Sequence, residues 1–511
     1  MLMTLDDPRT VYAYHSEGMS YPRRAPFHPG AAYPEYRLGD LAGEPNAVYG
    51  AVRECWRLAG LDREHEGTPE WNPLKGLVRP GDTVVLKPNL VKERHPRDPD
   101  GWQYVLTHGS VVRAVADYVF LALEGRGRVI VADAPQTDSL FRAIAEVLGL
   151  DALRDFYRAR GLDFELLDLR REEWTERGGV IVRRDPLPGD PEGYVACDLG
   201  TSSEFEGHGG GGRYYGADYD EGEVNRHHTG GRHEYLISGT PVHADVVFNL
   251  PKLKTHKKAG ITVGLKNLVG INGDKNWLPH HTEAGPDSPG DERPARDAKG
   301  AAERSMVRRL RRLALRMPVV GPWLLARARG VGRHLFGDTD EVIRSGNWWG
   351  NDTTWRMCLD LNKALLYGGP DGTLRPGLPE NRKRHYALVD GVVAGEGRGP
   401  MNPDPVPAGL LLFGTSCASV DAACAVLMGF DPERIPVVRG AFRCRDYPLA
   451  EWDWTDVRLA SNRADWSRPL PDVAPEATLH FRPHYGWAGH IERSAAPVEP
   501  EPLPATAGAG R

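Results

Sequence analysis

The chain has 511 residues, of which 40% are hydrophobic and 26% are charged. That balance is typical of a folded globular protein and excludes an intrinsically disordered one. The 64 lysines and arginines and the 70 aspartates and glutamates give a net charge of −6. The chain as a whole therefore has no electrostatic attraction to nucleic acid or acidic membranes, so we expect no nucleic-acid partner and only local basic sites.

The cysteines and the N-terminal residues indicate the compartment. The six cysteines form no Cys-x-x-Cys pair, which excludes a zinc ribbon and an iron–sulfur cluster. They are predicted to be reduced, buried thiols: Cys55, Cys197, Cys358, Cys417, Cys424 and Cys444. The first residues contain early acids and no apolar segment of a secretory signal, and no apolar run reaches the ~18 residues of a membrane span. We therefore expect a cytoplasmic protein.

Strands and helices are predicted to alternate along most of the chain. Residues 1–45 show no period and predict an irregular N-terminal arm. Periodicity and chain breakers then predict, in order, a helix over 46–58, a strand over 83–86, a helix capped by Ser110, a strand over 128–133, a helix over 138–148 and strands over 163–169 and 245–250. A helix over 355–367, strands over 385–393 and 409–413, and a helix over 419–428 follow.

A strand, a helix and a strand at this spacing form the βαβ unit of a parallel sheet. We therefore predict an α/β fold, with a mostly parallel sheet flanked by helices, in a single large domain over 46–494. Two insertions interrupt this domain: a Gly-, Tyr- and His-rich one over 170–235 and a basic helical one over 285–345. The tail over 495–511 is rich in Pro, Ala and Gly and is expected to be disordered.

Within the basic insertion, residues 301–334 show a basic, partly amphipathic pattern of two short helices that separate around Pro318 and Pro322. One interpretation is a helical hairpin that packs its apolar face on the domain. The other is an element that docks on a membrane surface or on a partner protein. The sequence leaves both interpretations open.

Polar side chains follow four of the predicted strands at the point where each strand ends. Lys87 and Asn89 follow the first strand, Asp133 the second, the run 252–256 the third and Asp390 the fourth. Ligands of an open parallel sheet bind outside the carboxyl ends of its strands. We therefore expect these side chains to line one polar, cationic pocket.

The segment 251–281 is the richest in chemically active side chains. It holds six lysines, three histidines and repeated glycines, with few acids. Ammonium groups and accessible backbone N–H groups both favour phosphate and carboxylate oxygens. We therefore predict a small anionic molecule as ligand, bound by Lys87, Asn89, Lys252, Lys254 and Asn267. The interleaved apolar residues predict that much of the segment is buried.

Histidines gather in the same part of the chain, which indicates proton transfer or metal ligation. Eight of the 18 histidines lie within 208–281. For proton transfer, we expect His256 as a general acid–base and Lys266 as the group that stabilises a developing oxyanion. For a divalent metal, without an HExxH or HxH pattern, the candidate ligands are Asp133, Asp390, Glu396, His227, His228, His280 and His281.

Several common motifs are missing from the sequence. The Gly-rich run 207–212 has neither the GK[ST] nor the preceding strand of a P-loop, and no GxGxxG follows a strand. We therefore expect neither an NTPase nor a nicotinamide cofactor. There is no GxSxG motif, and Cys417 follows a strand without a papain-like context. A divalent metal is thus the one candidate cofactor, and its identity is unknown.

Six strings together resemble the family called domain of unknown function 362: VVLKPNLV at 84–91, THGSVVRAVADYV at 107–119, VIVADAP at 129–135, NLPKLKTHKKAGITVGLKNLVGI at 249–271, LVDGVVAGEGRGP at 388–400 and SVDAACAVLMGF at 419–430. They occur in the family's order and span most of 80–440. The resemblance places nine residues in signature segments: Lys87, Asn89, His256, Lys266, Asn267, Asp390, Glu396, Gly397 and Asp421. Many relatives carry a two-cluster ferredoxin domain, whose cysteines are missing here. The resemblance therefore implies a subtype without an iron–sulfur domain and leaves the chemistry open.

Two functions fit these patterns. The first is an enzyme that binds a small anionic metabolite and performs transfer, isomerisation or hydrolysis rather than hydride transfer. The second is a non-catalytic accessory protein that binds an anion or a metal and docks on a membrane or a partner through 301–334.

Overall fold

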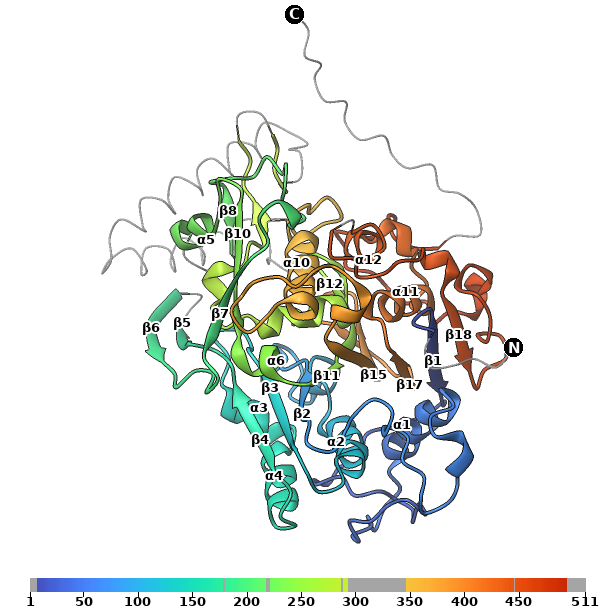
Figure 1. Cartoon of the computed structure of the whole chain (residues 1–511). Helices are drawn as coiled ribbons and strands as arrows, with labels where there is room; N and C mark the ends of the chain where they lie inside the picture. The colour runs from blue at the N-terminus through green and yellow to red at the C-terminus, as the bar shows by residue number, and fades with distance from the viewer. Residues whose placement is uncertain are drawn as a thin grey trace, which may run out of the picture.

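The computed structural model describes residues 7–177, 180–216, 221–285, 288–292, 346–444 and 446–493. The segment 301–334, most of the insertion 285–345 and the tail 495–511, each the subject of a sequence prediction, lie outside the described residues. In the described part, one large sheet runs through the molecule with helices on both faces (Figure 1). This arrangement confirms the α/β fold that the alternating pattern predicts.

The sheet has a parallel centre of five strands. In spatial order they are β15 (Arg384–Glu396), β11 (Val246–Leu250), β2 (Thr83–Pro88), β3 (Arg128–Asp133) and β4 (Phe164–Asp168). Apolar residues fill most of these strands, as expected for parallel strands that are covered on both faces. Their carboxyl ends share one edge of the sheet.

Beyond β15 the sheet continues with strands from both ends of the chain. β17 (Leu410–Gly414) is antiparallel to β15, β1 (Thr10–His15) is antiparallel to β17, and β18 (Arg458–Ser461) is parallel to β1. Figure 1 shows the blue β1 beside the red β18. β1 differs from the irregular arm expected over 1–45. Its sequence TVYAYH suits a strand, but it is too short to show a period by itself.

Two helical layers cover the sheet, because successive side chains of a strand point to opposite faces. Val84 and Leu86 enter one apolar core, and Val85 enters the other. The first core packs against α1 (Ala47–Leu58), α2 (Gly109–Leu123), α3 (Phe141–Val147) and α4 (Leu150–Arg158). The second packs against α7 (Gly264–Asn267), α10 (Thr354–Tyr367), α11 (Cys417–Leu427) and α12 (Pro436–Ala441).

Two helix boundaries differ from those predicted. The cap of α2 is His108, whose Nδ1 accepts a hydrogen bond from the backbone N–H of Ser110 at 3.1 Å, so Ser110 itself lies inside the helix. The helix predicted over 138–148 begins later, at α3, and is followed at once by α4. Gly149 separates the two with a φ of +65°, a conformation that glycine adopts without strain.

The insertion 170–235 forms small sheets beside the main one. Its elements are β5 (Glu172–Arg177), β6 (Val180–Pro186), β7 (Tyr194–Asp198), β8 (Tyr214–Tyr215), α5 (Glu221–His227), β9 (His228–Thr229) and β10 (Arg232–Ser238). The helices and strands not yet named lie after this insertion in the chain: α6 (Gly239–His243), β12 (Lys252–His256), β13 (Gly260–Thr262), β14 (His281–Thr282) and β16 (Asp404–Val406). β12 and β13 form a hairpin that joins the main sheet through β15.

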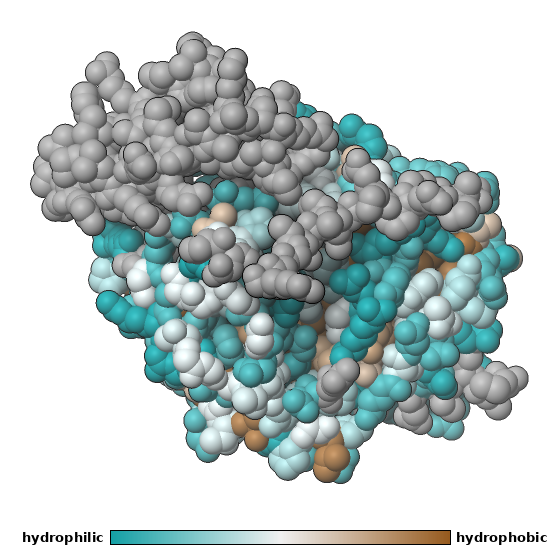
Figure 2. All heavy atoms as spheres, turned by 90° about the horizontal axis from the view of Figure 1, so that it is seen from above, coloured by the Kyte–Doolittle hydropathy of each residue, from teal (hydrophilic) through white to brown (hydrophobic). Residues whose placement is uncertain are grey.

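The described surface is mainly polar. Hydrophilic residues cover most of the described face that Figure 2 shows. In the described part of the chain, the well-exposed large apolar side chains are Leu41, Leu140 and Leu378. None of the described helices has both the length and the hydropathy to cross a membrane. All six cysteines are buried free thiols, which confirms the sequence prediction.

Candidate functional site

The carboxyl ends of β2 and β3 meet in a buried ion pair. The Lys87 Nζ lies 2.7 Å from the Asp133 Oδ1 and donates to the carbonyl of Pro88 at 2.9 Å. The other oxygen of Asp133 accepts the backbone N–H of Leu90 at 2.8 Å. Burial lowers the pKa of Lys87, and the Asp133 carboxylate opposes that shift. This pair therefore compensates its own charge within the protein.

Three buried asparagines join β2, β11 and α7. The Asn89 Nδ2 donates to the Asn267 Oδ1 at 2.8 Å, and the Asn267 Nδ2 donates to the Lys87 carbonyl at 3.1 Å and to the Asn249 Oδ1 at 2.8 Å. The Asn249 Nδ2 donates to the Gly264 carbonyl at 2.9 Å. The sequence prediction omits Asn249, although an amide near the end of the apolar strand VVFNL was a signal for it. Such a satisfied network fixes the positions of its members.

A second buried ion pair joins β12 and β15. The Lys252 Nζ lies 3.1 Å from the Asp390 Oδ2 and donates to the Tyr21 hydroxyl at 2.5 Å, and that hydroxyl donates to the Asp390 Oδ1 at 2.6 Å. Asp390 lies inside β15, not beyond the end of a strand as predicted. Tyr21 comes from the N-terminal arm, and no sequence pattern pointed to it.

Lys254 points to the same side of β12 as Lys252, and no carboxylate of the described residues binds it. Its Nζ donates to the Asn89 Oδ1 at 3.0 Å and to the Val105 carbonyl at 2.5 Å. Burial lowers the pKa of Lys254 well below its ordinary value, and the positive charges of Lys252 and Lys266 act in the same direction. The burial of both β12 lysines confirms that this part of the Lys-rich segment is internal.

A buried carboxylate positions α7. The backbone N–H groups of Gly264 and Leu265 donate to the two oxygens of Asp421 at 2.8 and 3.1 Å. Burial raises the pKa of Asp421 to about 8. This turn places Asn267 in the amide network and Lys266 beside it. The Lys266 Nζ has no hydrogen-bond acceptor and no ion-pair partner among the described residues, and burial lowers its pKa.

Lys275, a residue that the predicted site omits, completes the group. Its Nζ donates to the carbonyls of Val269 and Asn272 at 3.0 and 3.2 Å, and burial lowers its pKa to about 7. We call Lys87, Lys252, Lys254, Lys266 and Lys275 the lysine cluster. The charge of Lys266 lowers the pKa of five groups: Lys87, Lys254, His256, Lys275 and His280. Residues from β2, β12, α7 and the loop after it therefore share one electrostatic environment.

The hydrogen bonds of His256 define its tautomer. Its Nδ1 accepts the backbone N–H groups of Lys258 and Ala259 at 3.0 and 3.1 Å, so the proton of the neutral ring lies on Nε2. Burial lowers the pKa of His256 well below its ordinary value, and Lys266 adds to that shift. The neutral ring can therefore donate a hydrogen bond through Nε2–H. The general acid–base role expected from the sequence stays a prediction.

His280 has the opposite tautomer. Its Nδ1 donates to the carbonyl of Leu278 at 3.0 Å, which leaves Nε2 as the acceptor nitrogen of the neutral ring. Burial lowers the pKa of His280, and the charges of Lys266 and Lys258 contribute. Its neighbour His281 lies with Nδ1 3.3 Å from the Lys258 Nζ. The two rings are therefore held in opposite tautomers by backbone hydrogen bonds.

The seven predicted metal ligands do not form one set of donors. Asp133 and Asp390 bind lysines, and the Glu396 Oε1 lies 2.7 Å from the Arg482 Nε. The His227 ring lies between Glu223 and Glu234. The His228 Nε2 donates to the Trp277 carbonyl. His280 and His281 lie beside Lys258. In the described residues, these seven side chains do not converge on one point that could hold a metal ion, and their metal role stays a prediction.

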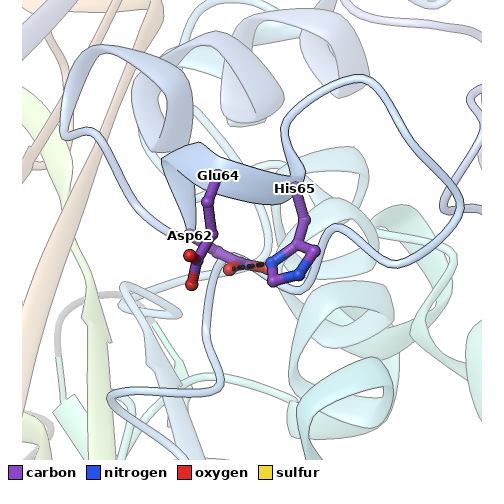
Figure 3. A group of neighbouring side chains, drawn as sticks. All are labelled: Asp62, Glu64 and His65. Atoms are coloured by element: carbon purple, nitrogen blue, oxygen red, sulfur yellow. Dashed lines mark hydrogen bonds and ion pairs between the residues drawn. The ribbon is translucent and has the colours of Figure 1, made fainter.

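A different group of three, Asp62, Glu64 and His65, lies in the loop after α1 (Figure 3). It is the one set in the described part of the chain whose His, Cys, Asp or Glu ligand atoms lie close enough to hold a metal ion. The Asp62 carboxylate, however, already binds the Lys75 ammonium as well as the His65 Nδ1, which lies 2.7 Å from its Oδ1. A lysine thus supplies the positive charge there, and we assign no metal to this loop.

The signature residues at the end of β15 lie beside a separate surface cavity. It has a volume of about 560 Å³ and is lined by Gly397, Arg398, Asp404, Arg482, Pro483, Tyr485 and Ala488. The Asp404 carboxylate binds the guanidinium groups of Arg97, Arg398 and Arg482. Glu396 therefore belongs to this arginine-rich surface and not to the lysine cluster.

Comparisons with known proteins assign the family. The model of the family described as Domain of unknown function (DUF362) matches residues 84–184 and 177–426. The chain is also 24% identical over 381 residues to a Thylakoid-associated protein of Synechocystis sp. (strain ATCC 27184 / PCC 6803 / Kazusa), a match that covers 74% of each chain. No solved structure matches the chain. Since the family match spans most of the sequence and all five members of the lysine cluster, this chain belongs to the family of the domain of unknown function 362.

Proposed function

We propose that the lysine cluster binds a small phosphate or carboxylate compound and that the chain is a cytoplasmic enzyme acting on it. One observation carries this proposal: Lys254, Lys266 and Lys275 have no carboxylate partner in the described residues, although they lie in a buried network. A buried ammonium group without a counter-charge is unfavourable. An anion that enters the cluster would remove that penalty.

The donors that remain unused indicate how the anion would be held. An ammonium group has three N–H donors. Lys254 and Lys275 each use two of them on protein oxygens, and Lys266 uses none on the described residues. Together with the Nε2–H of His256, these groups can surround a compact anion. Lys87 and Lys252 are already neutralised by carboxylates and would serve to support the site.

The chemistry that fits these groups is transfer, isomerisation or hydrolysis. The lysines and His256 would stabilise negative charge that develops on the bound molecule. A divalent metal remains a candidate cofactor, which the experiment below includes.

A thermal-shift screen of phosphorylated and carboxylated metabolites, with and without Mg, Mn, Zn and Ni, tests the proposal. A ligand at 100 times its Kd stabilises the protein by about 2.7 kcal/mol. We expect Lys275→Met to abolish that shift. Lys383→Met is the matched control, because Lys383 is also largely buried and donates to the carbonyls of Val242 and Ala244, outside the cluster. If no anion stabilises the wild-type protein, the proposal is wrong.

The second candidate function is that of a non-catalytic accessory protein at a membrane surface. The observation in its favour is the name of the Synechocystis relative, which describes that protein as thylakoid-associated. Co-sedimentation with anionic vesicles, compared between the full chain and a chain without 301–334, tests this candidate. Binding that requires 301–334, in a protein that turns over no anion found in the screen, would favour it over the enzyme.

A further inference from the structure

Lys266 differs from the other members of the lysine cluster in what its amino group contacts. The other four donate to a carboxylate, an amide oxygen or a backbone carbonyl. The Lys266 amino group contacts no acceptor among the described residues, and its side chain is partly exposed while the other four are buried. Its backbone is nevertheless fixed, since Asp421 binds the turn before it and the amide network holds Asn267 after it.

The surroundings of Lys266 favour its neutral amine form. Lys254 is linked through Asn89 to Asn267, the next residue, and Lys275 donates to the carbonyl of Val269, three residues further on. Lys254 and Lys275 are thus close enough to be coupled electrostatically to Lys266, and no carboxylate of the described residues binds its amino group. Burial lowers the pKa of Lys266. A desolvated lysine beside another cation is the usual arrangement of an amine that attacks carbonyl carbon.

We propose that Lys266 is a nucleophile that forms a Schiff base with a small anionic aldehyde or ketone. This proposal rests on the anion site proposed above and names the class of its substrate. Lys254 and Lys275 hold the carboxylate or phosphate of that substrate, and the amine of Lys266 supplies the lone pair. These roles follow from the contacts. Protein oxygens hold Lys254 and Lys275 in place, whereas the amino group of Lys266 bonds no acceptor among the described residues and can react.

The reaction needs no group beyond the protein, the carbonyl compound and solvent protons. The Nζ lone pair forms a bond to the carbonyl carbon while the C=O π pair moves to oxygen. One N–H proton passes to that oxygen, and a second proton from solvent lets it leave as water. The nitrogen then shares its lone pair with the carbon, which gives a protonated imine with one hydrogen on nitrogen. The nitrogen becomes positively charged only when the anionic group of the substrate is already bound beside it.

Reductive trapping of the full chain tests this proposal. The protein is incubated near pH 7 with glyoxylate, the smallest aldehyde that carries a carboxylate, and with sodium cyanoborohydride. Hydride reduces the imine carbon and leaves carboxymethyl-lysine, which peptide mass spectrometry locates. An anion site that holds the carboxylate of glyoxylate beside the amine raises the local concentration of the aldehyde there. We therefore expect Lys266 to be modified at least about tenfold faster than Lys75, whose side chain is 46% exposed and lies outside the cluster.

Two controls separate this proposal from the anion site. Glycolate carries the same carboxylate without a carbonyl group and should slow the labelling of Lys266 but not that of Lys75. Lys383, a buried lysine with a pKa lowered to about 8, should stay unmodified because it lies outside the cluster. Stabilisation by glycolate without preferential labelling of Lys266 contradicts the Schiff base and leaves anion binding intact. If glycolate neither stabilises the protein nor slows labelling, both proposals are overturned.

Discussion

The protein buries positive charge in two ways, one around α2 and the other in the lysine cluster. On the α2 face, the Arg113 Nε donates to both oxygens of Asp117 at 2.9 Å, and its other nitrogens donate to the Pro26 carbonyl and to the Tyr36 hydroxyl. Burial opposes the charge of Arg113, but Asp117 and the surrounding tyrosines raise its pKa overall. In the lysine cluster the balance is reversed, and burial lowers the pKa of every member.

On the proposal above, the difference separates a cation that serves folding from cations that await a ligand. The guanidinium of Arg113 finds its acceptors within the protein, so no outside molecule would improve its environment. No carboxylate of the described residues binds Lys254, Lys266 or Lys275 directly, so an anion would improve their environment. Buried groups with perturbed pKa values and incomplete partners are a mark of functional sites. The following predictions test this contrast, from the largest effect to the smallest.

Replacing the structural cation should cost the most stability. We expect Arg113→Met to lower the free energy of unfolding by about 3–5 kcal/mol, because it leaves the buried Asp117 carboxylate without its partner. Urea denaturation measures this loss. The control is Arg443→Met, since that side chain is 60% exposed and its ion pair with Glu433 should contribute less than about 1 kcal/mol. A loss of less than 1 kcal/mol for Arg113→Met would mean that Arg113 is not the structural cation that we contrast with the lysine cluster.

In the lysine cluster, Lys275 should make the free energy of unfolding depend on pH. Lys275 has a pKa of about 7 in the folded protein and about 10.5 when exposed, so between these values the unfolded chain binds more protons. The stability that wild type has relative to Lys275→Met should therefore rise with pH between about 7 and 10.5, by up to about 1.4 kcal/mol per pH unit. Below pH 7 the full penalty of the buried charge is present. A pH-independent difference between the two proteins would contradict the prediction.

Removing the least constrained lysine should leave the fold intact. We expect Lys266→Met to change the free energy of unfolding by less than about 1 kcal/mol, because it removes an amino group that contacts no acceptor and leaves no carboxylate unpaired. The same variant should lose the stabilisation that an anion gives to wild type. Urea denaturation and the thermal-shift screen measure the two effects. A large loss of stability would mean that Lys266 holds the fold together.

The smallest loss of stability should come from His256→Asn, and its comparison with His256→Ala separates the roles of the two ring nitrogens. Asparagine places an oxygen near the position of Nδ1, so His256→Asn should keep both backbone hydrogen bonds and cost less than about 0.5 kcal/mol. His256→Ala loses both bonds and should cost about 1 kcal/mol. Both variants lack the Nε2–H and should bind the anion more weakly. Tight anion binding by His256→Asn would show that the donor is unnecessary.

Sequence reasoning found the parts of the site that lie next to strong local signals. Lys87 and Asp133 end apolar strands, and the carboxyl ends of parallel strands meet by geometry alone. The partner of each lysine could not be predicted, because the partners lie far away in the chain. Lys252, for example, donates to the hydroxyl of Tyr21. The tautomer of His256 depends on two backbone N–H groups in the β12–β13 turn, a hairpin that the mixed apolar and basic pattern does not reveal.

The position of β1 has a consequence for the synthesis of the protein. β1 is synthesised before β2, β3 and β4, but both of its neighbours, β17 and β18, are synthesised after them, and the side chain of Asn462 bonds the backbone of His15 across 447 positions. During translation the nascent chain can assemble β2, β3 and β4 while β1 is still unpaired. The main sheet therefore forms in full only after β18 has left the ribosome, and a product truncated before β17 would leave an open edge at β1.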